Sequence, residues 1–264
     1  MLAIEYAPDS TKVNRICAQQ GISHPPTGWI CSEKIDGMRG VWDGSNMKTR
    51  EGNLIGIPAE FKQALPKIPL DGELVCKTGG REATGIFRRK IPSADHWAQA
   101  GVLYMVFDSP GPDLYEQRLE RAKRAICACS GPKWVTLLAQ VVIRDTQDFD
   151  TFFQHVINKN GEGVILRAPR SPYVCGYTPL LLKKKVQDEE PMTVVKLLAG
   201  KGKREGKIGS LKVRFDRTGQ LVNVGVLTGD VAWKVGDMAM VRFRGVSAQG
   251  KPLHTTLAHI NPIQ

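Results

Sequence analysis

Short β-forming runs separated by turn residues dominate the first two thirds of this chain, and this pattern restricts the fold to architectures built on sheets. The Asp43-Gly44 pair is a hairpin turn signal between two such runs. The predicted strands are residues 29–35, 40–42, 46–49, 70–76, 103–107, 135–143, 164–167 and 180–186.

Two segments carry helix signals instead. The apolar residues of segment 147–159 recur at i, i+3, i+4, i+7 and i+8, which predicts a helix with one buried face. Thr146 is predicted to be its N-cap. Residues 115–129 contain few helix breakers and carry alternating charges, a pattern that is typical of a helix with an exposed face.

The pattern changes after Val186. Residues 187–191 are polar, acidic and end in proline, so they are predicted to be a linker. Short strand runs follow at residues 193–198, 211–215, 221–226, 238–243 and 255–260, with no competing helix pattern. Short strands at this spacing predict a small closed β-barrel of the OB type, a fold that often binds oligonucleotides. The chain is therefore predicted to be an α+β protein with two domains: residues 1–187, with antiparallel sheets and helices, and residues 188–264, the barrel.

The charge of the chain indicates its partner. Lys and Arg number 37 against 26 Asp and Glu, which gives a formal net charge of +11. An excess of this size favours nucleic acid as the partner, and a basic protein without such a partner is the alternative. Hydrophobic residues make up 42% of the chain, an ordinary globular share that excludes a disordered chain.

The cysteines and the apolar stretches indicate the compartment. The six cysteines contain no C-x-x-C pair, so we predict reduced thiols and neither a zinc site nor a disulfide scaffold. No apolar stretch approaches the ~20 residues of a membrane span, and the N-terminal segment lacks the apolar core of a signal peptide. We expect a cytoplasmic protein with no membrane contact; a periplasmic protein with a removed leader is the alternative.

Five blocks with charged or aromatic residues follow one another along the chain. They are residues 34–39 (KIDGMR), 70–74 (LDGEL), 104–108 (YMVFD), 162–167 (EGVILR) and 181–185 (LLKKK). Their order resembles motifs I, III, IIIa, IV and V of the covalent nucleotidyltransferases. That superfamily comprises ATP-dependent DNA ligases, RNA ligases and mRNA capping enzymes.

The resemblance is strongest to the small ATP-dependent DNA ligases of bacteria and phages. Residues 29–44 (WICSEKIDGMRGVWDG), 71–74 and 200–203 (GKGK) resemble that group, and the likeness extends from about Trp29 to the C-terminus. It implies a nucleotidyltransferase domain followed by an OB domain. It also implies a monomer that uses ATP and Mg²⁺ to seal 5′-phosphate/3′-hydroxyl nicks in double-stranded DNA.

In such enzymes a lysine attacks the α-phosphate of ATP, and the resulting lysine–AMP passes its AMP to the DNA 5′-phosphate. The 3′-hydroxyl then attacks this adenylylated end and seals the nick. The resemblance assigns the nucleophile to Lys34. A lysine amine attacks only when it is unprotonated, and neighbouring cations favour that form. Lys183, Lys185 and bound Mg²⁺ are expected to supply those cations and to neutralise charge on the α-phosphate.

The acidic residues of the blocks have roles implied by the same resemblance. Glu162 is expected to hold Mg²⁺, since carboxylate oxygens are the ligands that this ion prefers. Glu73 is expected to contact the ribose or to assist at the metal. Asp36 is expected to contact the metal or the nick end in the later steps.

The remaining assignments concern the nucleotide. Phe107 is expected to stack on adenine, and Ser32 stands where the family contacts the adenine edge. Arg39 and Arg50 carry planar guanidinium groups that suit ribose and phosphate.

Two basic clusters are predicted to contact DNA phosphates, independently of base sequence and in a salt-sensitive way. The first lies between the second and third blocks, and the second is a glycine-rich loop at the start of the predicted barrel. The residues are Arg81, Arg88, Arg89 and Lys90 in the first cluster, and Lys201, Lys203, Arg204 and Lys207 in the second. Ordinary solvated charge is the alternative for each residue.

The C-terminal segment departs from the family pattern. Small ligases usually end in an arginine-bearing motif VI, but residues 252–261 (PLHTTLAHIN) have Leu253, His259 and Asn261 at the arginine positions. Motif VI helps to orient the pyrophosphate leaving group, so lysine adenylylation is the step that this departure affects. An RNA ligase, a capping-type nucleotidyltransferase and a non-catalytic nucleic-acid-binding relative remain the alternatives to a DNA ligase.

Overall fold

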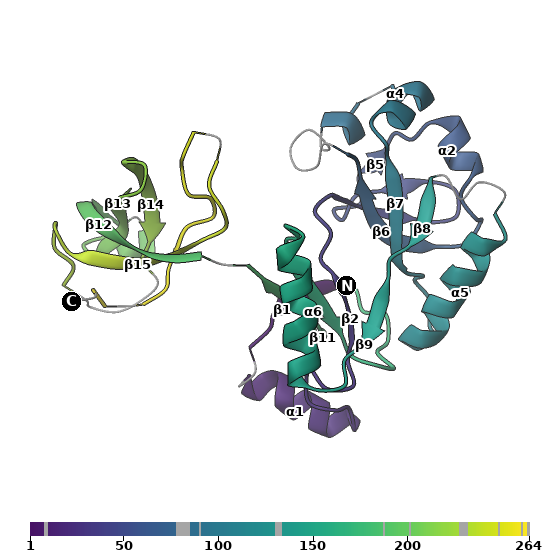
Figure 1. Cartoon of the computed structure of the whole chain (residues 1–264), viewed down its shortest axis with the longest axis horizontal. Coiled ribbons are helices and arrows are strands. Elements are labelled where there is room, and N and C mark those ends of the chain that lie inside the picture. The colour runs from purple at the N-terminus through teal and green to yellow at the C-terminus, as the bar shows by residue number, and fades with distance from the viewer. Residues whose placement is uncertain are drawn as a thin grey trace. The chain divides into compact units, whose positions relative to one another are not determined.

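Two units, Met1–Lys185 and Val186–Gln264, make up the chain, and each has its own hydrophobic core (Figure 1). The structure is a computed structural model. It describes residues 1–7, 10–77, 85–89, 91–129, 134–186, 188–200, 202–226, 232–247, 249–259 and 261–262. No helix in this described part is long and apolar enough to cross a membrane.

The first sheet of the N-terminal unit has the strand order β1-β11-β10-β2-β9. Its strands are β1 (Leu2–Glu5), β11 (Tyr177–Lys185), β10 (Gly163–Arg167), β2 (Ile30–Glu33) and β9 (Gln140–Val142). Helices α1 (Thr11–Gln20) and α6 (Thr146–Asn158) cover one face, where Cys17 and Phe149 pack with Cys31 and Val164. Successive strand residues point to opposite faces, so Ser32 and Ile165 face away from these helices.

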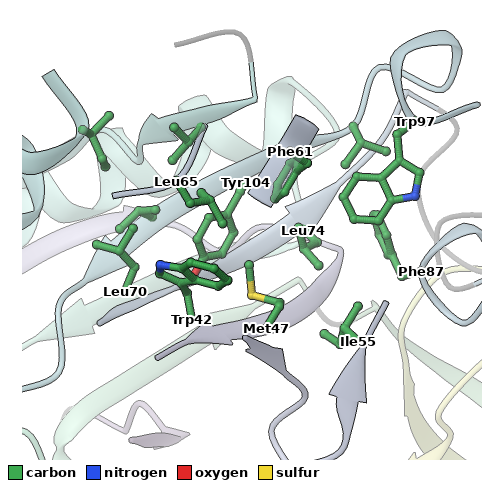
Figure 2. Packing of buried hydrophobic residues seen from close by; sticks show 14 of the residues in the cluster. Trp42, Met47, Ile55, Phe61, Leu65, Leu70, Leu74, Phe87, Trp97 and Tyr104 are labelled. Atoms are coloured by element: carbon green, nitrogen blue, oxygen red, sulfur yellow. The ribbon is translucent and has the colours of Figure 1, made fainter. Parts of the chain in front are cut away.

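The second sheet has the order β5-β4-β3-β6-β7-β8. Its strands are β5 (Leu54–Ile55), β4 (Met47–Lys48), β3 (Met38–Trp42), β6 (Leu70–Val75), β7 (Leu103–Asp108) and β8 (Val135–Leu137). Helices α2 (Ala59–Gln63), α4 (Ala94–Gln99) and α5 (Tyr115–Cys127) contribute to its core (Figure 2). There the rings of Phe61 and Trp97 meet edge to face at 4.8 Å, and the Tyr104 hydroxyl donates to the Gly40 carbonyl at 2.7 Å.

The C-terminal unit contains an antiparallel sheet of order β14-β13-β12-β15-β16. Its strands are β14 (Gln220–Gly225), β13 (Ile208–Phe215), β12 (Asp188–Ala199), β15 (Met238–Phe243) and β16 (Thr256–Leu257), and a 3₁₀ turn covers Gly202–Arg204. Leu211, Val213 and Phe215 of β13 alternate inward to its core, while Lys212 and Arg214 alternate outward.

The predicted mixture of sheets and helices is confirmed, and so is the Asp43-Gly44 turn, where the Asp43 N–H donates to the Asn46 carbonyl at 3.0 Å. Two pairs, β1 with β11 and β7 with β8, are parallel rather than antiparallel. The strands β1 and β5 and the α-helices α1, α2 and α4 were not predicted. The prediction of one strand at residues 135–143 is wrong, because β8 joins the second sheet and β9 joins the first.

Two local predictions are also corrected. The predicted N-cap Thr146 is the first residue of α6, and Asp145 is the N-cap, since its carboxylate accepts from the Asp148 N–H at 2.8 Å. The predicted linker is wrong for residues 188–191, which belong to β12 and pair with β15. Its acidic residues instead form ion pairs, Glu189 with Arg242 and Glu190 with Arg217.

A buried ion cluster fixes the end of β7. The carboxylate of Asp108 accepts hydrogen bonds from Arg118 Nε at 2.8 Å and from Arg118 Nη2 at 3.1 Å. It also pairs with Arg167 Nη1 at 3.2 Å, and the side chains of Asp108 and Arg118 are fully buried. Since Asp108 follows Phe107 directly, the cluster holds the backbone at Phe107 in place.

We expect the substitution Asp108→Asn to destabilise the N-terminal unit strongly. It leaves two buried guanidinium groups without an anion, and breaking a buried pair in this way costs about 3–5 kcal/mol. Urea unfolding monitored by tryptophan fluorescence measures the loss. The control is Glu120→Gln on the same helix as Arg118, which removes only the exposed pair with Arg124. A shift for Asp108→Asn no larger than that of the control would contradict the role of this cluster.

Candidate active site

A cavity of about 240 Å³ lies against the face of the first sheet that α1 and α6 leave uncovered. Ser32 of β2, Ile165 of β10 and Leu181 of β11 line it from this sheet. Phe107 of β7 and Glu73 of β6 line it from the second sheet. The alternation of strand residues thus sends one set of side chains to the helices and the other set to the cavity.

Lys34 follows β2 and reaches this cavity. Its backbone N–H donates to the Gly163 carbonyl at 2.8 Å, and its side-chain amine donates to the carboxylate of Glu162. The second oxygen of Glu162 accepts from the amine of Lys185. Burial raises the pKa of Glu162, but the hydrogen bonds from Lys185 and Lys34 outweigh it, and the pKa lies below its ordinary value. An ionised carboxylate therefore bridges the side-chain nitrogens of Lys34 and Lys185 at the edge of the cavity.

A second ion pair orients Arg39 at the cavity. Its Nε donates to Asp71 at 2.9 Å and its Nη2 donates to the other oxygen of the same buried carboxylate. The Tyr173 hydroxyl also donates to Asp71, at 2.9 Å, and the Arg39 guanidinium lies 5.8 Å from the centroid of the Phe107 ring. Opposite Arg39 on β6, burial raises the pKa of Glu73 to about 8. The carboxyl of Glu73 is therefore largely protonated at neutral pH.

A larger open depression of about 920 Å³ shares Arg39, Arg50 and Glu73 with the cavity. Arg88 and Arg89, both exposed, line its rim. Arg50 pairs with Glu51 at 3.1 Å on the surface. A cationic surface thus adjoins the cavity that contains Lys34.

Comparison with known proteins identifies the family. A family model described as an ATP dependent DNA ligase domain matches residues 10–185, more than half of the chain. The chain belongs to the ATP-dependent DNA ligase family. The prediction of an enzyme of this family, whose function is nick sealing and whose members use ATP, is confirmed.

Individual proteins that are similar to this chain are also DNA ligases. The chain is 30% identical over 238 residues to a DNA ligase of Haemophilus influenzae, covering 89% of this chain and 87% of the relative. A solved structure from a structure–function analysis of Lig E DNA ligases is 27% identical, with a TM-score of 0.79 and coverage of 98% of this chain and 97% of that chain. The adenylate of the Chlorella virus DNA ligase shares the fold, with 20% identity, a TM-score of 0.55 and coverage of 100% and 98%.

This member of the ligase family brings together most of the residues that were predicted for catalysis, nucleotide binding and metal binding. Six of them line the cavity: Ser32, Lys34, Arg39, Arg50, Glu73 and Phe107. Glu162 and Lys185 adjoin these residues, because Glu162 forms ion pairs with both Lys34 and Lys185. The functions of these residues in the ligase reaction stay predictions.

Other predicted residues lie apart from the cavity or outside the described residues. Asp36 is exposed in the turn between β2 and β3, and the Lys183 amine pairs with Glu5 at 3.7 Å. The Arg204 guanidinium donates to the Val226 carbonyl within the C-terminal unit. Three predicted DNA contacts, Arg81, Lys90 and Lys201, lie outside the described residues. The side chain of a fourth, Lys203, also lies outside them.

Several residues that line the cavity were not predicted as site residues, among them Tyr115, Gln140 and Arg167. Tyr115 begins α5 and Gln140 begins β9, so neither belongs to the same local segment as Lys34. Arg167 stands at the end of the fourth block and could have been marked as a strand residue facing the same way as Ile165. Tyr115 and Gln140 gave no local signal.

Proposed function

We propose that this chain seals nicks in duplex DNA by transferring AMP from ATP to Lys34 and from Lys34 to the 5′-phosphate of the nick. The observation that carries this proposal is the position of the Lys34 amine, held by Glu162 at the edge of a cavity of about 240 Å³. A bond forms between the Lys34 nitrogen and the α-phosphorus as the bond to pyrophosphate breaks. The 5′-phosphate then displaces Lys34, and the 3′-hydroxyl displaces AMP.

The nucleotide occupies the cavity of about 240 Å³ in this proposal. The Phe107 ring stacks on adenine, with Ser32 at the base edge, and Arg39 and Arg50 bind ribose and phosphate. Glu73 contacts the ribose, because its raised pKa lets the protonated carboxyl donate to a hydroxyl oxygen. The same protonation makes Glu73 the weaker metal ligand of the two carboxyl groups.

Mg²⁺ fits this site through Glu162. Among the residues that the structure describes, no three His, Cys, Asp or Glu side chains cluster as metal ligands. Mg²⁺ does not need such a cluster, since it commonly binds one or two carboxylates together with substrate phosphates. The ion, when bound, neutralises negative charge on the phosphate oxygens. Glu162 supplies its carboxylate, while Lys185 and Lys183 supply fixed positive charge on β11.

The DNA contacts proposed for the N-terminal unit follow the open depression. Arg88 and Arg89 on its rim bind backbone phosphates, and Asp36 lies on the exposed turn where a nick end reaches Lys34. The loop at Lys201, Lys203 and Arg204 is proposed as a second contact.

The two units are proposed to be a nucleotidyltransferase domain, residues 1–187, and an OB barrel, residues 188–264. The antiparallel five-stranded order β14-β13-β12-β15-β16 in the described residues supports the barrel. We further propose that the protein acts as a monomer in the cytoplasm, and the six free cysteines agree with a reducing compartment.

Purified protein, ATP and Mg²⁺ should seal a nicked DNA duplex and should carry covalently bound AMP when the DNA is omitted. The same nick with RNA strands, and GTP in place of ATP, should give much lower rates. Denaturing gels of labelled strands measure sealing, and mass spectrometry measures the adduct. Faster sealing of RNA would favour an RNA ligase, guanylylation would favour a capping-type enzyme, and the absence of any adduct would favour a non-catalytic relative.

A further inference from the structure

The carboxylate of Asp71 receives three hydrogen bonds, and one of them comes from a residue outside the five blocks. Arg39 donates through Nε at 2.9 Å to one oxygen and through Nη2 to the other. The Tyr173 hydroxyl donates at 2.9 Å to the oxygen that Nη2 also contacts. The side chain of Asp71 is buried, so its carboxylate depends on donors from the protein. Tyr173 therefore completes the ion pair that orients Arg39 at the cavity.

The side chain of Tyr173 is held in turn by the buried cluster around Asp108. Tyr173 lies in the segment between β10 and β11, and the Ser171 carbonyl of this segment accepts from Arg118 Nη1 at 2.8 Å. The Arg118 guanidinium also lies 5.5 Å from the centroid of the Tyr173 ring. Arg118 is fixed by its two hydrogen bonds to Asp108. The Tyr173 hydroxyl thus approaches Asp71 from a fixed position.

The hydroxyl of Tyr173 can only donate in this contact. Burial raises its pKa above the ordinary value, and the neighbouring Asp71 carboxylate raises it further, so the hydroxyl stays protonated at neutral pH. An ionised carboxylate has acceptors and no donor. The direction of the hydrogen bond is therefore set.

Restraining the carboxylate of Asp71 also restrains the plane of the Arg39 guanidinium. The last torsion of an aspartate side chain has a broad distribution, so a carboxylate without a further contact can turn about its Cβ–Cγ bond. A bidentate pair between arginine and a carboxylate joins two planar groups through parallel hydrogen bonds, so the guanidinium turns with its partner. The Tyr173 hydroxyl selects one orientation, because it bonds to one particular oxygen.

Arg39 keeps donors for a ligand in this orientation. A guanidinium has five N–H groups. In the described part of the chain, two of them meet Asp71 and one, on Nη1, meets the Met1 carbonyl. Arg39 lines the cavity, so its other two N–H groups can meet a nucleotide there.

We propose that Tyr173 is a positioning residue for the nucleotide: its hydroxyl fixes Asp71, and Asp71 fixes the plane in which Arg39 meets the ribose and phosphate. This inference rests on the proposed function, in which Arg39 contacts the nucleotide. Tyr173 itself does not line the cavity and needs no contact with the substrate. Loss of its hydroxyl should therefore weaken nucleotide binding and leave the reacting amine of Lys34 unchanged.

The test compares Tyr173→Phe with the wild-type chain, because phenylalanine keeps the ring beside Arg118 and removes only the hydroxyl. Calorimetry measures the affinity for α,β-methylene ATP, whose α–β bridge does not break when Lys34 attacks. Mass spectrometry measures adduct formation at increasing ATP concentration, which separates the half-saturating concentration from the maximal rate. The matched control is Tyr177→Phe at the start of β11, where the side chain is 71% exposed and lies outside the cavity.

We expect Tyr173→Phe to weaken binding of α,β-methylene ATP about 10-fold, the effect of one hydrogen bond to a charged group. The half-saturating concentration of ATP should rise by the same factor, while the maximal rate stays within about twofold of the wild-type value. Tyr177→Phe should match the wild-type chain in both measurements.

A second variant separates positioning from a merely structural role. Arg39→Lys keeps a cation beside Asp71 but has no planar fork that a neighbour could orient. Adding Tyr173→Phe to Arg39→Lys should therefore cost no further affinity, since residues that act through one another are not additive.

Wild-type affinity in Tyr173→Phe would overturn the assignment. The same loss in both backgrounds would also overturn it, because Tyr173 would then act independently of Arg39, and so would a lower maximal rate at an unchanged half-saturating concentration. A wild-type chain that binds α,β-methylene ATP but forms no adduct with ATP would remove the proposed function, and the affinities would still decide the role of Tyr173. A wild-type chain that binds no nucleotide would overturn both.

Discussion

Replacing Lys34 with arginine should abolish covalent attachment of AMP, with a loss of more than about 10⁴-fold in adduct formation. Arginine keeps the positive charge beside Glu162, so the ion pair that holds the site survives. Its guanidinium stays protonated in proteins and has no lone pair with which to attack phosphorus. The substitution therefore separates the nucleophile from the charge, which an alanine substitution does not do.

Mass spectrometry of the protein after incubation with ATP and Mg²⁺ measures this loss. The matched control is Lys48→Arg on β4, where the lysine pairs with Asp43 at 2.9 Å and lies outside the cavity. The control should form the adduct at the wild-type rate. Sealing of a nick that already carries AMP should persist in Lys34→Arg, since that step does not use the lysine as a nucleophile. Adduct formation by Lys34→Arg would rule out Lys34 as the attacking group.

The convergence of Lys34, Glu162 and Lys185 could be anticipated from the sequence because each stands near the end of a predicted strand. Lys34 follows β2, Glu162 precedes β10 and Lys185 ends β11. Because β10 pairs antiparallel with both β2 and β11, these three strand ends lie next to one another at the same end of the sheet. Regular antiparallel pairing is therefore enough to bring residues from separate blocks together at one site.

The split of residues 135–143 could not be anticipated. The whole run has strand-forming residues, and β-propensity does not depend on which sheet accepts a strand. The chain leaves the second sheet after Leu137 and joins the first at Gln140. Gln140 lines the cavity because the chain crosses between the sheets at this point. The sequence did not reveal this crossing, and for that reason it did not reveal Gln140 as a cavity residue either.

The sequence of helix α1 contains capping residues, although its apolar residues do not form a strong periodic pattern. Ser10 caps its first turn, Val13 and Cys17 are buried four residues apart, and Gly21 ends it with φ of 61°. The Asp108–Arg118 pair had no such signal, because its members lie on β7 and α5 and meet only through tertiary packing. Local patterns therefore identify elements, while the contacts that orient the site depend on the fold.

Glu162 is the residue whose neutralisation should most affect the chemistry while leaving DNA binding intact. Its carboxylate accepts from Lys34 and Lys185 and is the proposed Mg²⁺ ligand. Its pKa lies below the ordinary value of 4.5, so the stabilisation from these pairs is present above pH 4.5 and is lost as the pH falls through the lowered pKa. At neutral pH the carboxylate is thus ionised, and Glu162→Gln removes a charge without changing the shape of the side chain.

We expect Glu162→Gln to lower lysine adenylylation and nick sealing by about 100- to 1,000-fold, the usual loss when one preorganised electrostatic contact is removed. The affinity for nicked DNA, measured by fluorescence anisotropy, should stay at the wild-type value, because DNA phosphates bind cations rather than this carboxylate. The matched control is Asp150→Asn, which removes the neighbouring pair with Lys184 at 3.6 Å outside the cavity and should leave both measurements unchanged. Parallel losses of DNA affinity and sealing in Glu162→Gln would mean that the carboxylate only supports the fold around Lys34. The metal would then have to bind through substrate phosphates and another carboxyl group of the cavity, such as Glu73.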